Sequence, residues 1–220
     1  MNKHSHREGT MSLEKLDTAT RREQIVEAAA QLINAGGVGA LSMAAVARRV
    51  GLVPSAIYRH FSGKEELIDR VLDHILAHIR ANVEEVRRAT PDPVRRLKDL
   101  LNRQVRLIVE NRALARIAFN DEICRGNPRR RAALYAGIVG LLEAVAGIIR
   151  SGREDGLLPP GPPPETLALV FVGIVHPAAF LWHLSDGEFD LPRHVQLGWK
   201  LLEASLRGDA GSLKVKDESQ

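Results

Sequence analysis

The segment from Ser42 to Lys64 has the composition of a surface that binds a polyanion. Its charged residues are all basic, namely Arg48, Arg49, Arg59 and Lys64. Their summed charge of +4 equals the formal net charge of the whole 220-residue chain, so the remainder is balanced. Uncompensated positive charge on a compact element attracts the phosphate backbone of nucleic acids. The segment therefore predicts a contact with DNA.

Local signals divide this segment into two short helices joined by a turn. Ser42 can cap a helix over residues 43–50, and Gly51 can end it. Pro54 suits the first turn of a second helix, over residues 54–60, where no N–H is needed. In such a pair the second helix can enter the major groove while the first spans the DNA backbone. The alternative is a generic three-helix core whose arginines face water and contribute only to solubility.

The rest of the chain also carries helical signals. Apolar residues recur at helical spacing, and no run alternates as a strand would. Further helices are predicted over residues 20–36, 64–89, 94–108, 112–124, 129–151, 165–184 and 191–207. Ser62 and Glu65 suggest a capping box at the start of the long fourth helix. The sequence thus predicts an all-α fold of nine helices in two parts.

Composition and motifs exclude several classes of protein. With 45% apolar and 26% charged residues, this is an ordinary globular sequence, and its single cysteine, Cys124, fits a reducing cytosol. Residues 1–17 lack the apolar core of a signal peptide. Residues 166–185 are uncharged, but a proline and two histidines interrupt them, so we expect a buried helix and no membrane partner. No catalytic motif is recognisable, so we expect neither an enzyme nor a cofactor.

Residues 20–72 resemble the DNA-binding domain of TetR-family (tetracycline-repressor-type) transcriptional regulators. The matching elements are Ser42, Ala47-Arg48-Arg49-Val50-Gly51-Leu52, Ile57-Tyr58-Arg59-His60-Phe61 and Lys64-Glu65-Glu66-Leu67. The resemblance implies phosphate contacts at Ser42, Tyr58, His60 and Lys64, and base reading at Pro54, Ser55 and Ala56. We also expect Arg59 to face the DNA. Val53 stands where the family commonly has a Ser or Thr cap.

The layout of the second half is similar to the same family, whose members hold a ligand cavity and dimerise through their last two long helices. We therefore expect an arm (1–18), a helix-turn-helix domain (19–80), a ligand-binding and dimerisation domain (81–208) and a tail (209–220). The expected dimer interface contains Phe171, Val175, Trp199 and Leu202. The alternative is that these helices pack within one monomer.

The resemblance implies a cytoplasmic homodimer that binds a pseudo-palindromic double-stranded operator, acts as a repressor and responds to an unknown small molecule. Two alternatives stay open, a ligand-independent DNA-binding factor of the same fold and a helical small-molecule carrier.

Candidate pocket residues are the polar and aromatic side chains on otherwise apolar helices. They are His74, His78, Phe119, Tyr135 and Trp182, and each also suits a core or an interface. His74 and His78 lie four residues apart, a spacing that also suits two ligands of one metal ion, but we expect hydrogen bonding and no metal. The run Arg129 to Arg131 is expected on the solvated surface, near Asp121 and Glu122.

Overall fold

A computed structural model describes residues 17–118 and 127–209, and within these ranges the regular structure is entirely helical. The helices are α1 (Thr18–Gly36), α2 (Met43–Arg49), α3 (Pro54–Ile57), α4 (Lys64–Ala89), α5 (Pro93–Glu110), α6 (Arg112–Ala118), α8 (Pro128–Glu154), α9 (Pro164–Leu184) and α10 (Leu191–Arg207), with a 3-10 turn at Val38–Ala40. The all-α prediction is confirmed. The second short helix is shorter than predicted, because residues 58–60 form turns after Ile57.

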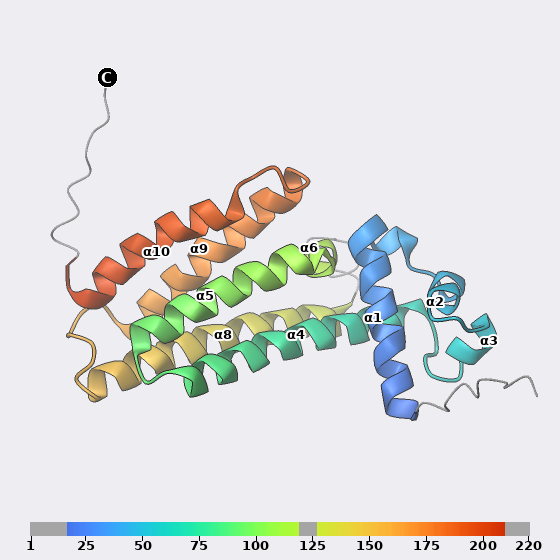
Figure 1. The fold of residues 1–220 in the computed structure, drawn as a ribbon, viewed down its shortest axis with the longest axis horizontal. Helices are drawn as coiled ribbons and strands as arrows, with labels where there is room; N and C mark the ends of the chain where they lie inside the picture. The colour runs from blue at the N-terminus through green and yellow to red at the C-terminus, as the bar shows by residue number, and fades with distance from the viewer. Residues whose placement is uncertain (1–16, 119–126, 210–220) are drawn as a thin grey trace, which may run out of the picture.

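The chain forms two apolar cores that share α4 (Figure 1). One core joins α1–α3 and the first three turns of α4, and α6 adds Ala113 and Ile117 to it. The other core joins the second half of α4 to α5, α8, α9 and α10. In Figure 1, α1–α3 lie at one end of the molecule and α4 runs lengthwise from them into the larger helical part. The long fourth helix therefore connects the two parts, as the sequence predicts.

The start of α4 is stabilised by Glu66 and not by the predicted Glu65. The cap position is Gly63, so Glu66 is the third residue of the helix. Its Oε2 accepts hydrogen bonds from the backbone N–H of Ser62 at 2.7 Å and from the Ser62 hydroxyl at 2.9 Å. These bonds lower the pKa of Glu66 below its usual value, with a smaller contribution from Arg22. The predicted capping box between Ser62 and Glu65 is therefore wrong, because Ser62 pairs with Glu66 and the cap residue, Gly63, makes no side-chain hydrogen bond.

Helices α8 and α9 are long and apolar enough to cross a membrane, judged by length and composition alone. Core helices of soluble proteins pass the same test, and both helices contribute to the larger core. Their side chains in that core include Leu141 and Val145 of α8 and Phe171 and Val175 of α9. The two helices therefore fit the interior of a helical domain.

Candidate nucleic-acid interface and ligand cavity

The turn between α2 and α3 has the geometry of a helix-turn-helix motif. The Ser42 hydroxyl oxygen accepts a hydrogen bond from the backbone N–H of Ala45 at 3.1 Å and so caps α2. At the other end Gly51 has φ of +70°, a conformation that favours glycine. The Leu52 N–H then donates to the carbonyl of Ala47 at 2.8 Å, which closes a Schellman motif. This turn directs the chain into α3.

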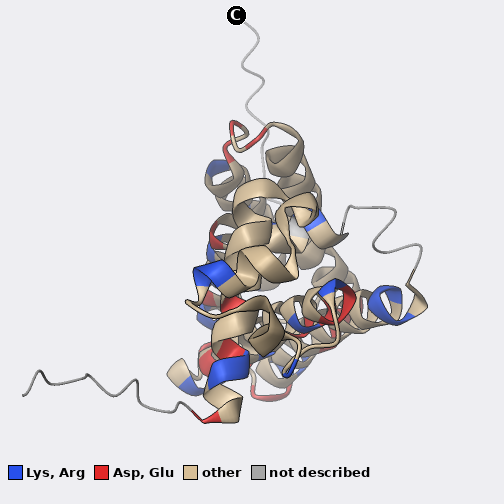
Figure 2. Cartoon of the chain, turned by 90° about the vertical axis from the view of Figure 1, so that its right-hand side faces the viewer, with Lys and Arg blue, Asp and Glu red and all other residues tan. Residues whose placement is uncertain are grey.

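The eight predicted DNA-contact residues all lie at the surface of the small domain. Five are exposed: Ser42, Pro54, Ser55, Tyr58 and Arg59. Three are half-buried: Ala56, His60 and Lys64. The core positions between them, Ala47 and Ile57, are buried. Figure 2 looks onto this end of the molecule, with lysines and arginines in blue. The arrangement leaves the polar and cationic side chains free to meet a DNA groove.

Arg22 of α1 fastens the end of the motif to α4, and sequence reasoning missed it. Its Nη1 donates a hydrogen bond to the carbonyl of His60, and its Nη2 lies 3.3 Å from Oε1 of Glu66. Its guanidinium also stacks over the Phe61 ring, 4.3 Å from the centroid. One side chain therefore ties α1, the segment after α3 and α4 together, so that α3 is held in a defined position relative to α4.

Arg130, in the first turn of α8, makes a second connection to α4. The side chain is 2% exposed, although the sequence predicts a solvated one. Its Nε donates to Oδ1 of Asp69 at 2.5 Å, and its Nη2 donates to the carbonyl and the carboxylate of Glu65. Burial lowers the pKa of Arg130, but the bonds to the two carboxylates outweigh it and raise the pKa overall. Asp121 and Glu122, the acidic residues expected near this arginine run, lie outside the described residues.

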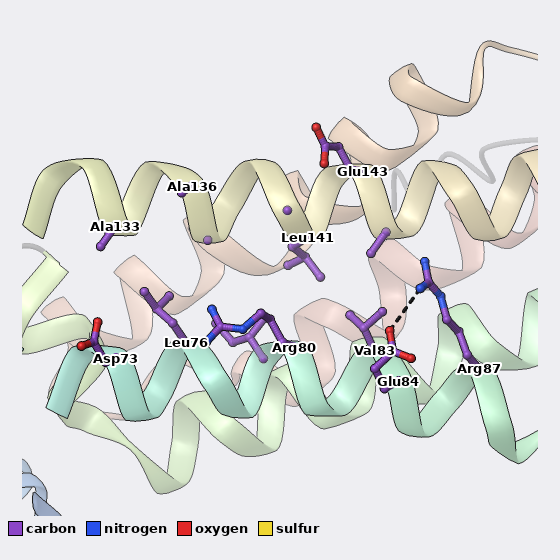
Figure 3. A pocket seen from close by; sticks show the side chains of 14 residues that line it. Asp73, Leu76, Arg80, Val83, Glu84, Arg87, Ala133, Ala136, Leu141 and Glu143 are labelled. Atoms are coloured by element: carbon purple, nitrogen blue, oxygen red, sulfur yellow. Dashed lines mark hydrogen bonds and ion pairs between the residues drawn. The ribbon is translucent and has the colours of Figure 1, made fainter. Parts of the chain in front are cut away.

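Two adjoining cavities lie beside α4 and α8, the helices that Arg130 connects. The first, of about 650 Å³, opens between them and is lined by both apolar and charged residues. Figure 3 shows Leu76 and Arg80 of α4 and Leu141 of α8 pointing into this space, with Arg87 paired to Glu84. The second, of about 420 Å³, extends toward α5, α6 and α9. Leu76 and Leu141 line both cavities, so the two spaces share a wall.

The four predicted pocket residues that the structure describes, His74, His78, Tyr135 and Trp182, do not line these cavities. His74 and His78 pair with each other, Nε2 to Nε2 at 3.1 Å, and Leu76 and Ile79 occupy the cavity-facing sector of α4. Tyr135 is 71% exposed. Trp182 is buried beneath the guanidinium of Arg112, 4.6 Å from its ring centroid.

Phe119 lies outside the described residues. Among the described residues no group of three or more potential metal ligands is present.

The predicted interface residues Phe171, Val175, Trp199 and Leu202 are between 0 and 4% exposed in the single chain. They belong to the core of the larger domain, because α9 and α10 turn these residues toward α5 and α8. The exposed apolar residues of the same helices are Leu169, Val170, Phe180, Leu181, Leu184, Leu197 and Leu201. Gly198 lets α10 approach α9 closely, since an added Cβ would lie 2.7 Å from Ile174. The solvent-facing apolar surface of α9 and α10 is therefore formed by a different set of residues from the predicted one.

An exposed, cationic helix-turn-helix joined by a long helix to a second helical domain defines a DNA-binding protein. Residues 25–71 match the sequence profile of "Bacterial regulatory proteins, tetR family". The chain is 28% identical over 158 residues to the HTH-type transcriptional regulator TtgR of Pseudomonas putida, covering 66% of this chain and 73% of that protein. Residues 25–71 are thus a DNA-binding domain of the tetR family, and over a longer range the chain is similar to a transcriptional regulator that carries this domain.

Solved structures of related regulators share the fold. A TetR-family regulator from Agrobacterium tumefaciens superimposes with a TM-score of 0.70 at 19% identity, covering 86% of this chain and all of that chain. The regulator FadR from Bacillus subtilis, solved in complex with stearoyl-CoA, superimposes with a TM-score of 0.64 at 21% identity, covering 84% of this chain and 98% of that chain.

Proposed function

We propose that this protein is a cytoplasmic, ligand-responsive repressor that acts as a homodimer on a pseudo-palindromic operator. The proposed ligand response is supported mainly by the 420 Å³ cavity, because its volume is within the range of small-molecule sites, about 300–1,000 Å³. It is lined in part by α4, the helix that begins beside the helix-turn-helix. FadR, which has the same fold, was solved with a bound acyl-CoA, so a ligand role is compatible with this architecture.

In this proposal residues 19–80 form the DNA-binding domain and residues 81–208 the ligand-binding and dimerisation domain. The predicted arm (1–18) and tail (209–220) lie almost wholly outside the described residues. Ser42, Tyr58, His60 and Lys64 contact phosphates. Pro54, Ser55 and Ala56 read bases, and Arg59 faces the DNA. Their surface positions support this assignment. Phosphate contacts set the register on the duplex, and base contacts supply the sequence preference.

The homodimer forms through the exposed apolar face of α9 and α10. Seven large apolar side chains are exposed on these two neighbouring helices. An apolar surface of this kind is more typical of a protein–protein interface than of a surface that faces water. Two copies of the face would pack as a four-helix arrangement. The dimer then presents two α3 helices to successive turns of one DNA groove, which requires a spacing of about 34–36 Å and a two-fold related operator.

The ligand acts by favouring one of two arrangements of α4. A molecule in the cavity contacts α4 through Leu76 and Ile79, about two to four turns beyond the Arg130 contacts at Glu65 and Asp69. A ligand with 100-fold different affinity for the two arrangements shifts their balance by about 2.7 kcal/mol. Movement at α4 is transmitted to Lys64 and, through Arg22, to the end of the motif.

The decisive experiment is selection of genomic DNA fragments by the purified full-length protein. The proposal predicts recovery of a motif with two-fold symmetry and half-sites about ten base pairs apart or a multiple of that. Recovery of fragments without a shared or symmetric motif would contradict a sequence-specific dimeric repressor.

A further inference from the structure

The second cavity contains one buried polar group whose hydrogen-bonding capacity is unused. Gln104 of α5 is 5% exposed and lines this cavity. Its Nε2 has no hydrogen-bond partner among the residues that the structure describes. Buried amide groups in folded proteins nearly always have a partner, because an unsatisfied donor costs free energy. An unpaired amide donor on a residue that lines a cavity suits an acceptor on the occupant.

The remaining lining residues that the structure describes carry no formal charge. Apolar side chains from all five surrounding helices predominate, including Leu76, Ile108, Leu134 and Phe180, and none of the described lining residues is Asp, Glu, Lys or Arg. His176 also lines the cavity, and burial lowers the pKa of its imidazole, which favours the neutral form. A charged group placed here would lose its hydration without gaining an opposite charge.

The adjoining first cavity does not compensate an anion either. Its charged lining residues are Asp73, Arg80, Glu84, Arg87 and Glu143, three carboxylates against two guanidinium groups. Arg87 is already paired with Glu84 at 3.1 Å. Asp73 is likewise paired with Arg70 at 3.4 Å, so Arg80 and Glu143 remain and balance each other. An anionic headgroup extending from the apolar cavity would thus meet no net positive charge. The charges of both cavities favour an uncharged molecule.

We propose that the effector is an uncharged, mainly apolar molecule whose oxygen acceptor, a carbonyl or hydroxyl, receives a hydrogen bond from Gln104 Nε2. At about 30 Å³ per heavy atom, the share of one water in the liquid, a cavity of 420 Å³ holds roughly a dozen non-hydrogen atoms. This inference deepens the proposed function and rests on the same cavity, but it concerns ligand chemistry and not the DNA response.

The test compares three probes of matched length by calorimetric titration of the full-length protein at pH 7.5. These are 2-undecanone (neutral, with one acceptor), undecanoate (anionic) and undecylammonium (cationic). We expect 2-undecanone to bind at least tenfold more tightly than either ion. Equal or tighter binding of an ion, or no detectable binding of the ketone up to its solubility limit, would overturn the proposal.

Variants then test the role of Gln104. Gln104→Leu removes the donor at similar volume, and it should weaken ketone binding about three- to tenfold, the effect of one hydrogen bond. The matched control is Asn102→Leu, an exposed amide on the same helix, which should leave ketone affinity unchanged. Ile138→Trp, at a 41% exposed position of the lining, should fill the cavity and abolish binding. Unchanged ketone affinity in Gln104→Leu would exclude the proposed hydrogen bond.

Release of a bound operator fragment is measured separately with the same probes. If the ketone binds without releasing the operator fragment, the proposed ligand chemistry is supported and the proposed ligand-responsive repressor is contradicted. Release by undecanoate but not by the ketone would support the repressor and overturn the neutral-ligand proposal.

Discussion

Arg130 and Asp69, 61 residues apart in sequence, join the first turn of α8 to the second turn of α4 through a 2.5 Å hydrogen bond. The guanidinium is almost completely buried, and the Asp69 side chain is 21% exposed. The pair lies between the small domain and the cavities, since α8 also contributes Leu134 and Leu141 to the cavity wall. It therefore joins the start of α4, five residues after Lys64, directly to α8.

Arg130→Met is expected to destabilise the protein by about 2–3 kcal/mol, because the Asp69 carboxylate loses a charged, largely desolvated partner. The contact with Glu65 adds little, since that side chain is 73% exposed. Urea unfolding measures the change. The matched control is Arg131→Met, an exposed arginine in the same turn, for which a change within about 0.5 kcal/mol is expected. Equal effects of the two substitutions would contradict a structural role for the buried pair.

Lys64→Ala should weaken binding to all DNA sequences alike, because the lysine is proposed to contact a phosphate. The slope of log affinity against log salt concentration should decrease by about one unit. Fluorescence anisotropy at several salt concentrations measures both quantities. Lys98→Ala, an exposed lysine on α5 in the other domain, is the control and should leave the slope unchanged. If the two variants behave alike, Lys64 does not contact DNA.

Ser55→Ala should change sequence preference more than overall affinity. Ser55 is exposed near the start of α3, where a hydroxyl can reach a base edge. Competition between operator variants, with each base pair of the half-site exchanged in turn, measures the preference. A uniform loss across all sequences would instead assign Ser55 to the phosphate backbone.

Leu181→Glu or Leu201→Glu should convert the dimer into a monomer, because each introduces a charge into the exposed apolar face of α9 and α10. Burying that charge twice in a symmetric interface is costly. Sedimentation velocity measures the oligomeric state. Val109→Glu, at a 42% exposed position on α5, should leave the dimer intact. A protein that is already monomeric without these substitutions would contradict the proposed interface.

His176 should make stability depend on pH in the weakly acidic range. Desolvation lowers its folded pKa below 6.5, so the unfolded chain binds the proton more readily. Its contribution is fully present above pH ~6.5 and is lost as the pH falls through the folded pKa, by up to about 1.4 kcal/mol per pH unit. His176→Gln should therefore lose less stability than the unchanged protein between pH 7 and 5. Parallel curves over that range would contradict a desolvated imidazole at this position.

Much of the secondary structure could be predicted from the sequence because it depends on local signals. The predicted fourth helix, residues 64–89, has the bounds that the structure shows. The α2 cap at Ser42 and the turn at Gly51 also lie where the residue types require them. Exposure of the helix-turn-helix residues followed from the same pattern, since the apolar positions Ala47 and Ile57 define which side faces inward.

The inward face of α9 could not be predicted in this way. Apolar residues occupy every face of α9, so helical periodicity does not distinguish Phe171, which is buried, from Leu169, which is 63% exposed. Only the packing of α5, α8 and α10 against α9 decides between them.

The sequence alone determined an all-helical chain with a cationic helix-turn-helix, because caps, turns and helical periodicity act over a few residues. Tertiary structure alone decided which charges are buried and which side chains enclose the cavities. Arg130 finds its partners 61 and 65 residues away, and Gln104 becomes a cavity residue only where five helices meet. Such contacts depend on how distant helices are placed in space, which no local pattern of residues records.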